Sequence, residues 1–163
     1  MKNLFLLLAI LAGILVIPGC DKDGEKNYNT VKITDGEFSG FSLTFSPNQG
    51  FWSTVNESTR QVHLVFGDDE NIISNYENVM DILFYYNGQP EIIFPSAEGQ
   101  WIEMGLNIDG LLYYFQLQDA VLVIYHMDDY FFEGALSGEF TDSGGGSGTT
   151  TLTMDIRIDL QEI

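Results

Sequence analysis

Residues 130–161 read YFFEGALSGEFTDSGGGSGTTTLTMDIRIDLQ, and this stretch decides the fold. On both sides of its glycine-rich centre, apolar residues alternate with polar ones at every second position. That period is typical of strands that bury one face and expose the other. The segment from Thr141 to Gly148 between them is rich in Gly and Ser, as hairpin loops are. The stretch therefore predicts a β-hairpin that pairs Tyr130–Phe140 with Thr149–Gln161.

The register of this hairpin follows from packing. Pairing Phe140 with Thr150 sets small inward residues of one strand against large ones of the other, which fills a core evenly. The same register leaves Glu133 opposite Arg157 on the outer face, a pair worth up to ~1 kcal/mol. The predicted inward pairs are Phe140–Thr150, Gly138–Leu152, Leu136–Met154, Gly134–Ile156 and Phe132–Ile158.

A second hairpin is predicted around Asp109-Gly110, the strongest two-residue turn signal in the chain. It joins Gln100–Ile108 to Leu111–Gln118 in a register that a one-residue slip would spoil, because the slip would mix apolar and polar faces. The predicted inward pairs are Ile108–Leu111, Leu106–Tyr113, Met104–Phe115 and Ile102–Leu117. The predicted outward pairs are Asn107–Leu112, Gly105–Tyr114, Glu103–Gln116 and Trp101–Gln118.

Short alternating segments recur through the rest of the chain between Gly, Asn, Asp and Pro residues. We expect an all-β domain, an antiparallel β-sandwich of about nine or ten short strands, with a small lipocalin-like β-barrel as the alternative. Only Asn71–Met80 carries a period near 3.6, which favours a helix there. The further strands expected are Val31–Thr34, Glu37–Phe45, Arg60–Phe66, Asp81–Tyr86, Glu91–Phe94 and Val121–Met127.

The first residues are typical of a targeting signal rather than of a part of the fold. Lys2 precedes an apolar run from Leu4 to Ile17, which has the length of a signal-peptide core. The run ends in Ile17-Pro18-Gly19-Cys20, which resembles a bacterial lipobox, with Pro18 as a departure from its usual small residue. The resemblance implies cleavage after Gly19 and acylation of Cys20. The domains expected are a signal peptide at 1–19, a lipidated, acidic tether at 20–30 and a single all-β domain at 31–163.

Two further features bear on the compartment. The run Asp21-Lys22-Asp23-Gly24-Glu25 is similar to the surface-export signal of Bacteroidota-type lipoproteins, whereas in enteric bacteria an Asp after the Cys suggests inner-membrane retention. The C-terminal strand-Gly pattern also resembles small all-β surface lipoproteins of Bacteroidota-type bacteria, a family of unknown function. The resemblance implies a lipid-anchored outer-membrane protein at the cell surface, with the periplasmic face as the alternative. It implies no catalytic residue.

Charge excludes one class of partner. The chain has 24 Asp and Glu against 6 Lys and Arg, a net charge of −18. Nucleic-acid binding depends on basic residues that neutralise phosphates, so we expect no such partner. No Lys or Arg occurs from Gln61 to Asp155. The acidic surface also repels anionic membranes, so that an anchor on Cys20 would have to hold the protein there.

The sequence offers little to a catalytic mechanism. His63 and His126 lack a Cys partner, and neither is expected to have a carboxylate at ligand spacing on its own strand face. We therefore expect no enzyme, although 24 acids leave a carboxylate-based hydrolase open. No cofactor is expected; calcium is an alternative to solvated turns at two acidic clusters. Their residues are Asp68, Asp69, Glu70, Asp128 and Asp129.

Aromatic residues give the one candidate site. The doublets Tyr85-Tyr86, Tyr113-Tyr114 and Phe131-Phe132 each place one ring in the core and one outside, because successive strand side chains point to opposite faces. The outer rings would be Tyr85, Tyr114 and Phe131. An aromatic ring beside amides and carboxylates is how proteins hold the apolar and hydroxyl sides of a sugar. The candidate ligand-binding residues are Trp101, Glu103, Tyr114, Gln116, Gln118 and Tyr85.

Three hypotheses for function follow. The first is a non-catalytic lipoprotein that binds a glycan or another polar extracellular ligand on the aromatic face. The second is a structural or accessory module that docks on an outer-membrane protein through strand edges or aromatic residues. The third is a small barrel that carries an apolar ligand inside.

Overall fold

The chain folds as an all-β domain. The computed structural model describes residues 28–67, 78–94, 98–142 and 148–163, and ten strands lie within them. The all-β prediction is confirmed. The strands are β1 (Thr30–Asp35), β2 (Ser42–Thr44), β3 (Ser46–Asn56), β4 (Thr59–Gly67), β5 (Asn78–Tyr86), β6 (Glu91–Phe94), β7 (Trp101–Ile108), β8 (Leu111–Met127), β9 (Phe131–Asp142) and β10 (Thr149–Glu162).

The strand pairings close into a ring. Starting from β3, each strand pairs with the next through β4, β5, β7, β8, β9 and β10. The end of β10 then pairs with β3 in parallel, from Leu160↔Gly50 to Glu162↔Trp52, whereas all other pairings are antiparallel. Three strands lie outside the ring: β6 pairs with β8, β1 pairs with β10, and β2 pairs with β1. The pairing therefore combines features of the predicted sandwich and of the barrel alternative.

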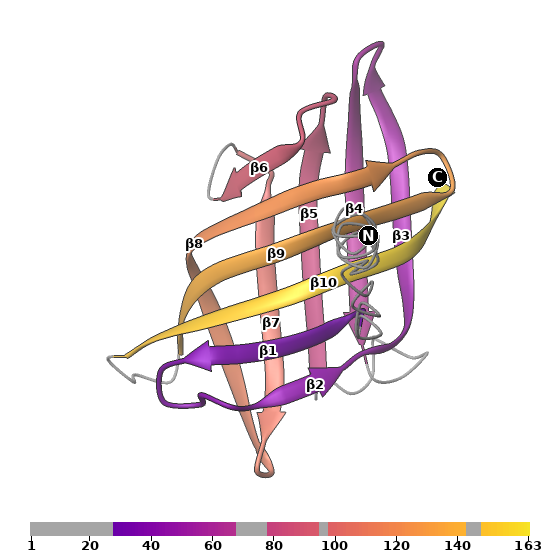
Figure 1. Cartoon of the computed structure of the whole chain (residues 1–163). Coiled ribbons are helices and arrows are strands. Elements are labelled where there is room, and N and C mark those ends of the chain that lie inside the picture. Colours follow the sequence, from indigo (N-terminus) through magenta and orange to yellow (C-terminus); the bar gives the residue numbers. More distant parts are fainter. Residues whose placement is uncertain (1–27, 68–77, 95–97, 143–147) are drawn as a thin grey trace, which may run out of the picture.

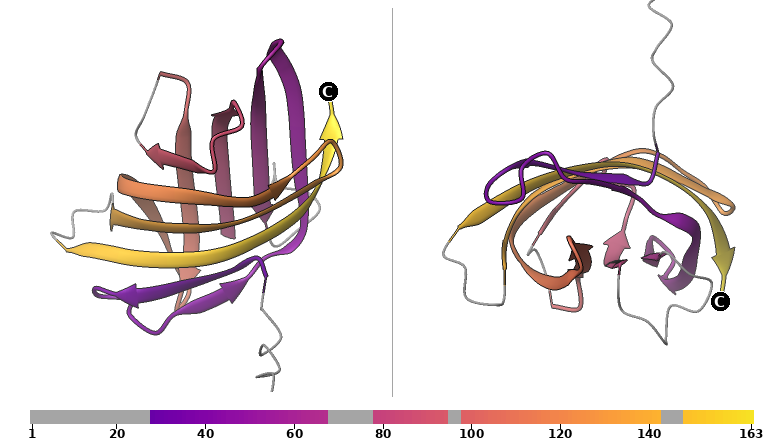
Figure 2. Two further views of the ribbon diagram at one scale, coloured as in Figure 1. Left: turned by 45° about the horizontal axis from the view of Figure 1, so that its top comes forward. Right: turned by 90° about the horizontal axis from the view of Figure 1, so that it is seen from below.

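Two layers of strands cross one another around the core. Figure 1 shows β1, β9 and β10 running across β3, β4, β5 and β7, and Figure 2 shows the strands curving around the space between the layers. Orthogonal packing of this kind needs strands that turn the corner from one layer to the other. The 17-residue strand β8 does this: it pairs with β7 over its first part and with β9 over its second, and its register shifts between Leu117 and Asp119.

Inward side chains of both layers form one contiguous hydrophobic cluster. Five phenylalanines are among its fully buried members: Phe66, Phe84, Phe94, Phe132 and Phe140.

Both predicted hairpin registers are confirmed where the strands pair. All six predicted pairs between β9 and β10 occur, including Glu133 opposite Arg157. In the second hairpin, Asp109 and Gly110 both have positive φ, 54° and 84°, as a mirror-image two-residue turn requires. The pairs from Glu103–Gln116 to Ile108–Leu111 follow the prediction.

The structure corrects the prediction at the far end of the second hairpin. The pairing of β7 with β8 ends at Glu103–Gln116, so the predicted pairs Ile102–Leu117 and Trp101–Gln118 do not form. These corrections share one cause, because the bulge in β8 turns the strand away from β7.

Other predicted elements also differ from the structure. Strand β3 was not expected, although it closes the ring. Only Ser42–Thr44 of the expected strand 37–45 is a strand, because residues 36–41 form a turn closed by the bond from Gly40 N to Ile33 O. The predicted helix 71–80 is wrong at 78–80, which belong to β5, and its first part lies outside the described residues.

One predicted inward residue is exposed. Leu111 is 62% exposed, because the β7–β8 turn extends past the core.

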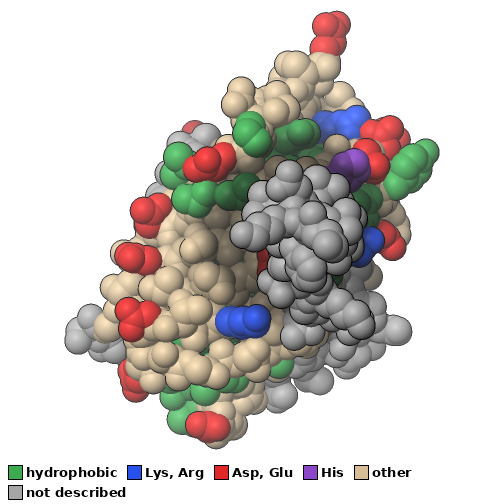
Figure 3. Space-filling model, in the orientation of Figure 1, with side chains coloured by type: hydrophobic (Ala, Val, Ile, Leu, Met, Phe, Trp, Pro, Cys, Tyr) green, Lys and Arg blue, Asp and Glu red, His purple; other side chains and the backbone are tan. Residues whose placement is uncertain are grey.

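Acidic side chains are spread around the margin of the face seen in Figure 3, where Lys and Arg are sparse. This distribution agrees with the net charge of −18.

The close approach of β9 to β8 depends on glycine. A Cβ at Gly134 would lie 2.5 Å from the carbonyl oxygen of Val123 in β8, a backbone atom that cannot swing aside. We expect Gly134→Ala to lower the free energy of unfolding by ~1–3 kcal/mol, the usual cost of overpacking. Urea unfolding of the detergent-solubilised full chain would measure it.

Gly148→Ala is the matched control, because nothing lies within 4 Å of the Cβ that it adds. The control is expected to stay within ~0.5 kcal/mol of the wild type. Equal stability of the two variants would contradict the close-approach argument.

Candidate functional site

The outward face of β4, β5 and β7 carries three of the six residues expected to bind a ligand: Tyr85, Trp101 and Glu103. Cross-strand pairing sets His63, Leu83 and Trp101 in one row, and Asp81 beside Glu103 in the next. This set, extended by Gln116 of β8 opposite Glu103, is called the Trp101 face below.

A carboxylate joins the two rows. Asp81 Oδ1 accepts a hydrogen bond from the indole Nε1 of Trp101 at 3.3 Å and lies 2.7 Å from Nε2 of His63. The indole and the imidazole are therefore held on either side of one oxygen. Leu83 lies between them in the row and is only 6% exposed, so it provides an apolar floor.

The polar groups expected beside the indole are available to solvent. Trp101 is 39% exposed, and Glu103 and Gln116 are exposed and directly opposite each other. Tyr85 also lies on this face, and Nε2 of Gln61 donates to its hydroxyl at 3.3 Å. The structure thus places Trp101, Glu103, Gln116 and Tyr85 on one outward face.

Two predicted residues serve the fold as well. The ring of Tyr114 lies over Gly105, since a Cβ there would meet two ring carbons at 3.5 Å; this is the aromatic cover of a strand glycine. Gln118 follows the bend of β8, and its Nε2 donates to the hydroxyl of Thr141 in β9 at 3.0 Å. Gln118 therefore bonds to the layer that contains β9 rather than to Trp101.

The alternation predicted for the three aromatic doublets is confirmed. Tyr86 and Tyr113 pack against the core, and Phe132 is fully buried. Phe131, on the outer face, lies under the guanidinium of Arg157, which is 5.1 Å from its ring centre. Glu133, which pairs with Arg157 across β9 and β10, accepts a hydrogen bond from the hydroxyl of Tyr28 at 2.8 Å.

Sequence reasoning missed Asp81 and His63 as parts of the site. Their contact is diagonal across β4 and β5, where His63 faces Leu83 and Asp81 faces Val65. Only the register between β4 and β5 reveals the contact between Asp81 and His63. His126 also has a carboxylate partner that sequence reasoning missed: Asp128 follows the end of β8, and its Oδ2 is 3.0 Å from Nε2 of His126.

The acidic clusters proposed for calcium divide in two. Asp68, Asp69 and Glu70 lie outside the described residues. Asp129 forms an ion pair with Arg60 at 2.6 Å. The backbone N–H of Tyr130 donates to Asp128, and this bond, together with His126, holds the pKa of Asp128 below its ordinary value. Within the described ranges, no three or more His, Cys, Asp and Glu side chains gather as metal ligands would.

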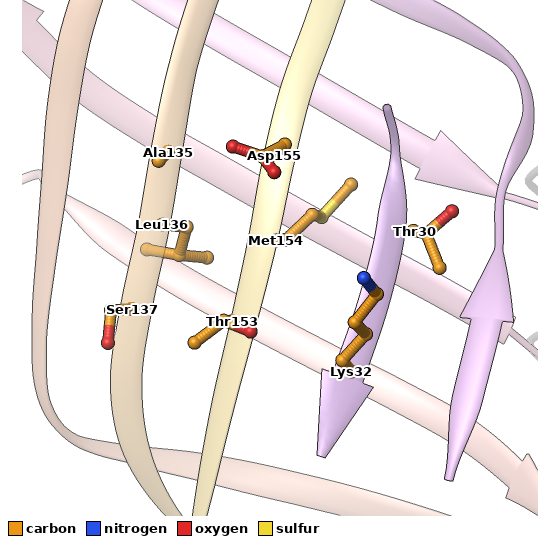
Figure 4. A pocket seen from close by; sticks show the side chains of 8 residues that line it. All are labelled: Thr30, Lys32, Ala135, Leu136, Ser137, Thr153, Met154 and Asp155. Atoms are coloured by element: carbon orange, nitrogen blue, oxygen red, sulfur yellow. The ribbon is translucent and has the colours of Figure 1, made fainter. Parts of the chain in front are cut away.

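A small groove lies on β1, β9 and β10 (Figure 4), away from the Trp101 face. Lys32, Thr153 and Asp155 are among the residues that line it, and its volume is about 160 Å³. Small-molecule sites usually measure about 300–1,000 Å³, so this groove is too small to be a ligand site of that kind.

Comparison of the chain with protein-family models, with curated proteins and with solved structures finds no match. The described part of the chain contains no helix that is long and apolar enough to span a membrane.

The hydrogen bond to Asp81 is expected to restrain the indole of Trp101. In Asp81→Ala, the indole loses its acceptor, so acrylamide should quench the fluorescence of Trp101 more efficiently. The other tryptophan, Trp52, is buried and donates to the carbonyl of Asp129, so its contribution should not change. Trp101→Phe isolates the signal of Trp52. Identical quenching in wild type and Asp81→Ala would show that the bond does not restrain the ring.

Proposed function

We propose that this protein is a non-catalytic, lipid-anchored lipoprotein that binds a neutral glycan on the Trp101 face. The observation that carries the proposal is the restrained, partly exposed indole of Trp101 beside the exposed pair Glu103 and Gln116. The indole offers a flat apolar surface to a sugar ring. The carboxylate of Glu103 can accept hydrogen bonds from the sugar hydroxyls. The amide of Gln116 can both donate to them and accept from them.

Preorganisation supports this function. Fixing a side chain on binding costs about 0.5–1.5 kcal/mol, and a ring that is already held avoids part of that cost. Asp81 accepts a hydrogen bond from the indole of Trp101, and the same carboxylate oxygen contacts His63. The net charge of −18 favours a neutral ligand over an acidic polysaccharide, because the whole surface repels anions.

The place where the chain enters the domain also supports the proposal. Asn29 donates through its side chain to the carbonyl of Arg157 at 2.8 Å, on the layer that contains β9 and β10. The Trp101 face belongs to the layer of β4, β5 and β7, which crosses behind it in Figure 1. The eight residue steps from Cys20 to Tyr28 span at most about 29 Å. An anchor on Cys20 would therefore hold the first layer towards the membrane and leave the Trp101 face open.

A second candidate is docking on a partner protein through β6. Among the described strands, β6 pairs only with β8, and Ile93 on it is 56% exposed. A free strand edge with an apolar side chain is a common place for a partner strand to add. The third hypothesis, an apolar ligand inside the barrel, gains no support from the contiguous packing of the inward side chains.

Binding of a glycan should raise the melting temperature of the full chain in a zwitterionic detergent that has no sugar headgroup. A ligand at a hundred times its dissociation constant stabilises the folded state by ~2.7 kcal/mol, which is roughly 5–10 °C for a domain of this size. We expect such a shift with one class of neutral polysaccharide and a loss of affinity of about tenfold or more in Trp101→Ala.

Tyr130→Ala is the matched control for that experiment. Tyr130 is an aromatic residue that is 78% exposed, but it lies at the β8–β9 turn. The control should bind the glycan as the wild type does. The glycan proposal would be overturned if no polysaccharide raised the melting temperature, or if Trp101→Ala and Tyr130→Ala lost affinity equally.

Acylation of Cys20 is tested separately. Cells grown with an alkyne analogue of palmitate should incorporate the label into the wild-type protein and not into Cys20→Ser, because the chain has only this cysteine. The labelled protein should partition with membranes and have lost residues 1–19 by mass spectrometry. An unlabelled or uncleaved wild-type protein would refute the anchor without affecting the binding proposal.

A further inference from the structure

The mouth of the ring between β3 and β5 carries polar side chains at inward-facing positions. Trp52, Val62 and Phe84 are buried in the core. Two residues further along, Thr54 pairs with Arg60 and Arg60 pairs with Tyr86, so these three side chains continue the same inward face. The core ends at this row, because the adjoining residues form the β3–β4 and β5–β6 turns, which lie at the same end of the molecule in Figure 1.

A hollow of about 300 Å³ opens here, at the lower limit of the usual size of small-molecule sites, about 300–1,000 Å³. The mouths of β-barrels are among the places where such sites occur. Its walls are the inward row and the two turns. The lining residues are Thr54, Asn56, Glu57, Ser58, Thr59, Arg60, Tyr86, Asn87 and Gly88.

Two contacts keep Arg60 from collapsing into the hollow. Its guanidinium forms an ion pair with Asp129 of the β8–β9 turn at 2.6 Å, and it lies 4.3 Å from the ring centre of Trp52. The half-buried Tyr86 packs against the core on the other side. The walls of the hollow are therefore fixed by the fold before any ligand arrives.

The turns leave hydrogen-bond donors for a ligand. Asn56 uses its carbonyl oxygen to accept from the backbone and hydroxyl of Ser58, and Asn87 uses its own to accept from the backbone of Gln89. Their amide NH₂ groups make no hydrogen bond within the described residues. The same holds for the hydroxyls of Thr54 and Tyr86, which also border the hollow.

We propose that this mouth is a second binding site, which takes a single neutral sugar residue. Hydroxyl and ring oxygens would accept from the amides and hydroxyls, and Glu57 would accept from a sugar hydroxyl. Asp129 neutralises Arg60 and Glu57 adds a negative charge, so the site disfavours an anion. The inference does not rest on the Trp101 face, because Tyr86 and Tyr85 point to opposite sides of β5.

The test is a ligand-observed NMR titration of the full chain, in detergent without a sugar headgroup, with the methyl glycosides of glucose, galactose, mannose and N-acetylglucosamine. At least one should bind. Tyr86→Phe and Thr54→Val each remove a hydroxyl while conserving shape, so each should weaken binding by about 3- to 10-fold. Tyr85→Phe is the matched control on the outward side and should bind as the wild type does.

Further outcomes separate the two sites. Trp101→Ala should leave monosaccharide binding unchanged. The proposal is overturned if none of the four glycosides binds, if Tyr86→Phe and Thr54→Val bind as the wild type does, or if Trp101→Ala alone abolishes binding. Tighter binding of galacturonate than of methyl galactoside would also overturn it, because the site would then be one for anions.

Discussion

The contact between β10 and β3 at Gly50 is the constraint on which the rest of the structure depends. Only three residue pairs close the ring here, and they are parallel. A Cβ at Gly50 would lie 2.7 Å from a methyl carbon of Leu160 and 2.9 Å from the carbonyl oxygen of Asp159. A larger residue would therefore force the strands apart at the narrowest join. The adjacent bonds from Leu160 N to Tyr130 O and from Ile163 N to Trp52 O strengthen the same corner.

Closure at this corner positions both proposed sites. It fixes β3 and β4, whose ends form the mouth, and brings the β8–β9 turn close enough for Asp129 to reach Arg60. From β4 the pairing continues to β5 and β7, and the outward-pointing side chains of these strands form the Trp101 face. The two crossing layers thus separate the side on which the chain enters from the side that we propose binds the glycan. A single fold supplies an orientation as well as a surface.

The sequence predicted the parts of the fold in which pairing is local. The two hairpins around Asp109-Gly110 and between β9 and β10 each join neighbouring segments, so alternation and turn residues were enough to set their registers. Strand β3 was missed because Pro47, Asn48 and Gly50 interrupt its alternation. Its stability comes from partners on both sides, one of which is more than a hundred residues away in the chain.

The candidate site was predictable to a similar extent. Alternation placed Trp101, Glu103, Tyr114 and Gln116 outside, because that inference needs only the parity of one hairpin. It could not place Asp81 beside Trp101, since β7 pairs with β5 and skips β6. It also put Gln118 with Trp101, because the bulge that turns β8 away leaves no clear mark in the sequence. Contacts between strands that are not neighbours in the sequence are set by the topology of the sheet rather than by the local sequence pattern.

The central claim is that the Trp101 face binds the ligand, and the two indole N–H signals in an NMR spectrum test it most directly. Trp101 donates to Asp81, whereas Trp52 donates to the carbonyl of Asp129 and lies next to the mouth under Arg60. A neutral polysaccharide on the Trp101 face should move the signal of Trp101, whereas the signal of Trp52 reports separately on a sugar in the mouth. A glycan that binds without moving the Trp101 signal would contradict the claim.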